Sequence, residues 1–63
     1  MRTLTKKQKN YIDKLVEKRD IISWEDFTLN EQTDLEKMND TEILWMEAQR
    51  YAMDRTMDKK YRR

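Results

Sequence analysis

Apolar residues in the first third of the chain recur at the spacing of one helix face. With residues placed 100° apart, five of them fall within one arc of about 140°, and Thr5 and Gln8 lie inside the same arc. The five are Leu4, Tyr11, Ile12, Leu15 and Val16. This pattern predicts an amphipathic helix over residues 4–18 that buries one side.

Side-chain caps mark the next boundaries, because the chain contains no glycine and no proline. Ser23 precedes an acidic first turn, and Thr28 with Glu31 forms the Ser/Thr-x-x-Glu pattern of a capping box. Two caps so close together predict helical structure over residues 24–38 with a break near residue 28, and one unbroken helix is the alternative. Either arrangement predicts that four apolar side chains are buried: Trp24, Phe27, Leu35 and Met38.

The last third of the chain predicts one long helix. Asn39 with Glu42 matches a third capping box, so the helix is expected over residues 40–58, followed by a basic tail at residues 59–63. Its apolar residues fall on two faces, one with Leu44, Trp45, Ala48, Tyr51 and Ala52 and the other with Ile43, Met46, Met53 and Met57. Polar residues separate the faces, with Glu47, Asp54 and Asp58 on one side and Gln49 and Thr56 on the other.

A second apolar face on one helix has two explanations. The first two helices can pack on both sides of it and bury everything, or the second face meets another molecule. Methionine is flexible and polarizable and suits both irregular cores and adaptable interfaces, so both explanations stay open. For the second explanation, the predicted partner-binding residues are Ile43, Met46, Arg50, Met53 and Met57.

Size and composition limit the core that this chain can form. It has 63 residues, of which 37% are hydrophobic and 43% charged. Chains of this size bury only about 60% of their unfolded surface, and without cysteine or histidine no disulfide or Cys/His zinc site adds stability. We predict a single all-α domain of two or three helices over residues 1–63, in which the long C-terminal helix is the central element. A helical homodimer is one way to complete its core.

The residue types used in catalysis are scarce. No histidine or cysteine is present as a base or thiol nucleophile, Ser23 is the only serine and stands at a cap, and no glycine can form a phosphate-binding loop. We therefore predict a protein that is not an enzyme and that uses no cofactor.

Charge is arranged in three blocks behind a net charge of +1. Residues 1–19 and 48–63 are basic, whereas residues 20–47 carry nine acidic side chains and one basic. An acidic face is predicted from Glu25, Asp26, Glu31 and Asp34, which would steer the chain toward a basic partner or imitate a phosphate backbone. Their spacing matches no calcium loop, so no metal site is predicted.

The two basic arms suggest nucleic-acid binding as an alternative. The residues expected to contact phosphates are Lys7, Lys14, Lys18, Lys59, Lys60, Arg62 and Arg63. The acidic middle argues against this function, because a helix that reads DNA would carry Arg, Lys or Asn there. Affinity for DNA that falls steeply with salt would favour it.

Residues 4–40 read LTKKQKNYIDKLVEKRDIISWEDFTLNEQTDLEKMND, a run rich in Lys, Asn, Ile and Glu that includes a Trp-Glu-Asp-Phe-Thr step. In this usage the run resembles the small accessory proteins encoded in phages and mobile elements of AT-rich bacteria. The resemblance implies a regulator or inhibitor that binds a host protein stoichiometrically. We also expect a cytoplasmic location, because no apolar run approaches about 18 residues and no secretion signal is present.

Overall fold

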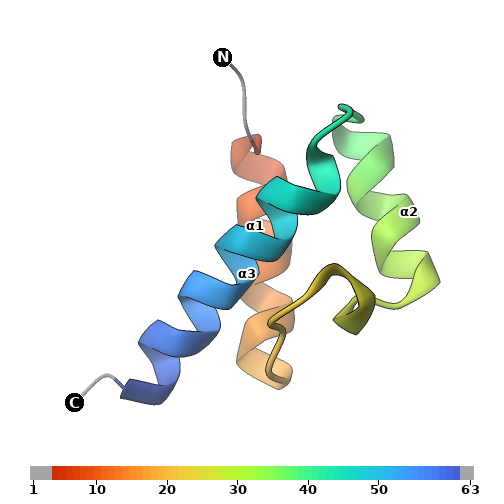
Figure 1. The fold of residues 1–63 in the computed structure, drawn as a ribbon. Coiled ribbons are helices and arrows are strands. Elements are labelled where there is room, and N and C mark those ends of the chain that lie inside the picture. Colours follow the sequence, from red (N-terminus) through yellow and green to blue (C-terminus); the bar gives the residue numbers. More distant parts are fainter. Residues whose placement is uncertain (1–3, 62–63) are drawn as a thin grey trace.

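Residues 4–61 are described in the computed structural model, and they form three α-helices and one short 3-10 helix (Figure 1). In chain order, α1 spans Lys6–Lys18, η1 spans Trp24–Asp26, α2 spans Leu29–Met38 and α3 spans Leu44–Tyr61. None of these residues forms a strand. The predicted small all-α domain with a long C-terminal helix is therefore confirmed.

Helix α1 begins at a reciprocal cap. The Gln8 backbone N–H donates to Thr5 Oγ1 at 3.2 Å, and the Thr5 backbone N–H donates to Gln8 Oε1 at 2.9 Å. This capping box places the first helical residue at Lys6, two residues later than the apolar pattern predicted, because Thr5 stays extended. Leu4 lies before the cap and still packs into the core.

The region 24–38 contains two elements, separated near residue 28 as predicted. Thr28 and Glu31 form the second capping box, with backbone-to-side-chain distances of 2.9 and 3.2 Å. Thr28 is extended, so η1 and α2 are separate rather than one continuous helix.

Helix α3 begins later and ends later than the predicted range of 40–58. Asn39 does not start it; its backbone N–H donates to Leu35 O and ends α2. The chain then turns over residues 39–43, and α3 starts at Leu44, which is buried. At the other end the helix continues to Tyr61, so Lys59 and Lys60 belong to α3, while Arg62 and Arg63 lie outside the described residues.

The core lies mainly between α1 and α3, which cross each other while α2 stands to one side (Figure 1). Ala48 and Ala52 are fully buried and let the two helices approach closely. The remaining buried apolar residues are Leu4, Ile12, Val16, Ile21, Phe27, Leu35 and Leu44, and Tyr11, Leu15, Trp24 and Tyr51 pack partly buried against them.

Two residues predicted for the core are exposed. Trp45 was grouped with Leu44, Ala48 and Ala52 on one face of the last helix, but it lies in the first turn of α3 and is 49% exposed. Met38 is 36% exposed, and it is the last residue of α2.

Two buried polar side chains tie separate segments together. Thr56 Oγ1 accepts from the Ile21 backbone N–H at 3.1 Å and donates to Ile21 O at 3.0 Å, which fixes the connector after α1 against α3. Gln8 Nε2 donates to Leu35 O at 2.8 Å and to Asn39 O at 3.0 Å, which fixes the end of α2 against α1. Both side chains are essentially inaccessible to solvent.

Candidate functional site

Four of the five predicted partner-binding residues lie together on the outer side of α3, and the fifth, Ile43, directly precedes the helix. The five are Ile43, Met46, Arg50, Met53 and Met57, and we call this set the outer stripe. On the helix they occupy the side opposite Leu44, Ala48 and Ala52, which face the core. The three methionines are 48%, 39% and 46% exposed, and Ile43 is half-buried.

The rest of the chain packs elsewhere on α3. Helix α1 covers the inner side, and η1 reaches one flank, where the Trp24 backbone N–H donates to Gln49 Oε1 at 3.0 Å. Helix α2 packs mainly against α1. The first two helices therefore do not bury both apolar faces of the long helix, and the explanation in which they do is wrong for these residues.

Charged side chains surround the methionines. Arg50 lies within the outer stripe, and Glu47 and Asp54 stand one turn before and after it on the same helix. Among residues 4–61, Arg50 and Asp54 make no hydrogen bond or ion pair. This surface thus combines flexible apolar side chains with charges that its own fold leaves unused.

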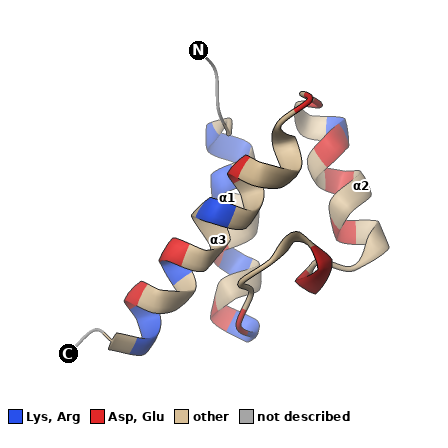
Figure 2. Cartoon of the chain, viewed as in Figure 1, with Lys and Arg blue, Asp and Glu red and all other residues tan. Residues whose placement is uncertain are grey.

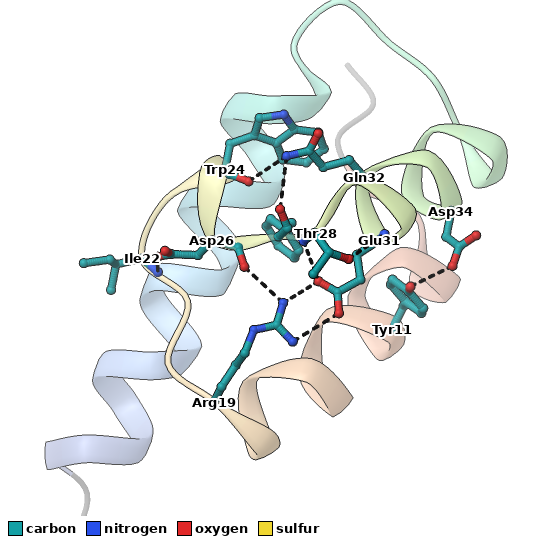
Figure 3. Close-up of polar contacts among 10 residues, drawn as sticks. Tyr11, Arg19, Ile22, Trp24, Asp26, Thr28, Glu31, Gln32 and Asp34 are labelled. Carbon is teal, nitrogen blue, oxygen red and sulfur yellow. Dashed lines mark hydrogen bonds and ion pairs between the residues drawn. The ribbon is translucent and has the colours of Figure 1, made fainter.

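The predicted acidic face is largely occupied by contacts within the fold (Figure 3). The Arg19 guanidinium pairs with the Glu31 carboxylate and also donates to Asp26 O at 3.0 Å. The hydrogen bond from Arg19 lowers the pKa of Glu31 below its ordinary value. The Asp26 carboxylate accepts from the backbone N–H groups of Ile22 and Ser23, at 3.0 and 3.2 Å. Only Glu25 of the predicted four has no such partner among the described residues.

Asp34, the last member of that face, holds the hydroxyl of Tyr11. Tyr11 Oη donates to Asp34 Oδ2 at 2.8 Å, joining α1 to α2 (Figure 3). Burial and then this hydrogen bond raise the pKa of Tyr11 from 10.0 to about 12. Acidic residues that looked like a docking surface in sequence therefore stabilise the helix arrangement.

The Tyr11 shift predicts a loss of stability at alkaline pH. The native state keeps a proton that the unfolded state releases, so this contribution is full below pH 10.0 and is lost as the pH rises toward 12. We expect Tyr11→Phe to flatten the fall in the free energy of unfolding over that interval. Denaturant titrations at a series of pH values measure it. Identical slopes for the variant and the wild type would contradict the assignment.

Basic and acidic residues both occur along α1 and α3 (Figure 2), and basic residues of the C-terminal arm pair with acidic residues of other segments. Asp20 Oδ1 lies 3.3 Å from Lys59 Nζ, and Asp20 Oδ2 lies 3.4 Å from Lys60 Nζ. These contacts lower the pKa of Asp20, the hydrogen bond from Lys59 most of all. Arg55 pairs with Asp13 at 3.1 Å. The three charge blocks thus partly neutralise one another on folding.

Because the three predicted lysines of α1 are exposed, nucleic-acid binding stays an alternative prediction. Lys7, Lys14 and Lys18 are exposed and make no ion pair among the described residues. Lys59 and Lys60, in contrast, are held by Asp20. Lys59 and Lys60 are therefore less available for phosphate contacts than the sequence predicted.

An open hollow of about 280 Å³ lies between α1 and α3. Its lining consists of Asp13, Val16, Glu17, Arg55, Asp58 and Lys59. Arg55 is paired with Asp13, and Lys59 Nζ donates to Val16 O, so these groups serve the helix packing. Within residues 4–61, no three acidic side chains are grouped so that they could hold a metal ion. Over the same residues, the helices are too short or too polar to cross a membrane.

Sequence reasoning missed the exposure of two apolar side chains outside the outer stripe. Trp45 and Ile22 are 49% and 55% exposed. Leu29, which one continuous helix over residues 24–38 would place on the side away from Leu35, is 79% exposed. Nothing in the sequence distinguishes Ile22 from Ile21, which is fully buried.

The chain was compared with protein families, curated proteins and solved structures. No family model, no curated protein and no solved structure matches the chain.

Proposed function

We propose that the protein is a small non-enzymatic regulator or inhibitor that acts by binding another protein stoichiometrically through the outer stripe. One observation carries the proposal: three methionines lie exposed along the side of α3 that no other helix of the described chain covers. Methionine-rich helix faces adapt to partner surfaces, and a helix presents them at the regular spacing that a groove accepts.

The fold supports this use of α3. Buried Ala48 and Ala52 hold the helix firmly against α1, while the Thr56 contacts hold it against the connector. A helix fixed on its inner side loses little further conformational freedom when its outer side is covered. The outer stripe is thus presented by a rigid element rather than by a loop.

The proposed target is a cytoplasmic protein of a host cell. This part rests on the resemblance of residues 4–40 to accessory proteins of phages and mobile elements. The charges beside the methionines indicate that the target surface is charged as well. Arg50, Glu47 and Asp54 border the methionines, and Arg50 and Asp54 have no partner among the described residues.

A charge placed in the stripe tests the proposal. We expect Met53→Asp to weaken capture of the target from a host lysate by at least about tenfold, because it puts a carboxylate into a desolvated contact. Helix content, measured by circular dichroism, should stay close to that of the wild type, since Met53 is exposed.

Leu29→Asp is the matched control. Leu29 is more exposed than Met53 and lies on α2, outside the stripe. It should retain the target at the wild-type level. Retention of the same proteins by Met53→Asp, or equal loss with both variants, would rule out the outer stripe as the binding face.

A further inference from the structure

The outer stripe has the spacing of a coiled-coil seam. Ile43, Met46, Arg50, Met53 and Met57 are separated alternately by three and four residues, which is the a/d repeat of a heptad. The repeat runs from residue 43 to residue 57, about 21 Å at 1.5 Å per residue, and leaves out the last turn of α3. Since this seam is exposed in one chain, it has the form of half an interface.

Arg50 indicates whether α3 of a second copy would pack parallel or antiparallel to the first. In a parallel pair, equal positions meet, so Arg50 would lie opposite Arg50 of the second copy. In an antiparallel pair centred between Arg50 and Met53, each Arg50 lies beside Asp54 of the second copy, and the two-fold axis repeats the contact. Neither residue has a partner among residues 4–61, so both are available for this exchange.

Charge at the two ends of α3 favours the same direction. Its start is strongly acidic, with Asp40 and Glu42 just before it and Glu47 in its first turn. Its last turn contains Lys59 and Lys60, which Asp20 holds, together with Asp58. Parallel pairing would place the two acidic starts together, whereas antiparallel pairing separates them and opposes the two helix dipoles.

We propose that the protein rests as an antiparallel homodimer in which two outer stripes cover each other and Arg50 pairs with Asp54 of the second copy. The inference rests on the proposed function, because it uses the same face. Self-pairing and target binding therefore exclude each other, and the target takes the stripe only as the dimer opens. Dimer formation thus sets how much stripe is available at a given protein concentration.

Sedimentation equilibrium of the full chain tests the pairing. We expect the mass to rise with concentration from 7.9 kDa to twice that value. A mass that stays at one chain over the whole range would overturn the homodimer. The proposed function would survive that result if Met53→Asp still lost a target that the wild type captures, so the two failures are distinguishable.

Charge variants test the ion pair. Arg50→Glu and Asp54→Arg should each weaken the dimer by about tenfold or more, since each brings like charges together across the interface. The double variant Arg50→Glu/Asp54→Arg should restore it in an antiparallel pair and leave it weak in a parallel one. The pairing would be overturned if the single variants formed dimers as strongly as the wild type, or if the double variant formed weaker dimers than either single variant. Circular dichroism of each variant confirms that α3 remains folded.

Disulfide trapping tests the direction, because the chain has no cysteine of its own. In the antiparallel pair position 46 faces position 57 of the second copy. A mixture of Met46→Cys and Met57→Cys chains should therefore form a mixed disulfide under mild oxidation, and each variant alone should not self-link. Efficient self-linking of the separate variants would show parallel pairing and contradict the inference.

Discussion

Thr56→Val is expected to lower the free energy of unfolding by about 3 kcal/mol, because it leaves two buried backbone groups without partners. The Thr56 hydroxyl satisfies both the N–H and the C=O of Ile21, at 3.1 and 3.0 Å. Valine has nearly the same shape, so packing changes little. Domains of this size have only a few kcal/mol of stability, and the variant should be partly unfolded at room temperature.

Thr56→Ser is the control for that substitution. It keeps the hydroxyl and removes one methyl group, so its cost should be near 1 kcal/mol. Urea titrations of the two variants and the wild type compare the costs. Equal destabilisation by serine and valine would show that the methyl group, and not the contact with Ile21, carries the effect.

Gln8→Met is the second large effect, with an expected loss of about 2 to 3 kcal/mol. The side chain of Gln8 caps α1 through Thr5 and donates to the carbonyls of Leu35 and Asn39. Methionine fills a similar volume but cannot donate to them, so the end of α2 loses its link to α1. Amide hydrogen exchange should rise first in α2.

The exposed neighbour Asn10 supplies the comparison for Gln8. Asn10→Met lies on the same helix and places the same side chain in solvent, so it should change stability by less than about 0.5 kcal/mol. If Gln8→Met proved as mild as Asn10→Met, the proposed clamp between α1 and α2 would be wrong.

Local signals predicted the helices well, because helix formation depends on near neighbours. The capping box of Thr28 satisfies backbone groups within four residues and is present as predicted, whereas the box of Thr5 was not predicted although it has the same local pattern. Asn39 carries a similar pattern but ends α2 instead, since its carbonyl is held by Gln8 from a distant helix. A local pattern cannot report a partner that lies 31 residues away.

Buried polar residues were the least predictable part of the fold. Thr56 looked like a separator between two apolar faces, yet it is buried because the connector at Ile21 brings a backbone N–H and C=O to it. Only the tertiary path of the connector reveals that contact. Trp45 shows the converse, because a large apolar residue that shares its helix face with buried Ala52 is left 49% exposed.

For the candidate site, the sequence located the residues but not their partners. The wheel projection placed the methionines on one face, and the structure leaves that face uncovered by α1, α2 and η1. The acidic face was harder to interpret, because Arg19 and Tyr11 reach it from another helix and use Glu31 and Asp34 for packing. Charge counts along a chain cannot distinguish a charged residue that is paired within the fold from one that is available to a binding partner.

Oxidation footprinting of the methionines tests most directly whether a second polypeptide shelters the outer stripe. Met38 is the internal reference, because it is also exposed but lies on α2 outside the stripe. As the concentration of the full chain is raised, we expect oxidation to slow at Met46, Met53 and Met57 and to stay unchanged at Met38. Equal rates at all four methionines, independent of concentration, would contradict the sheltered stripe.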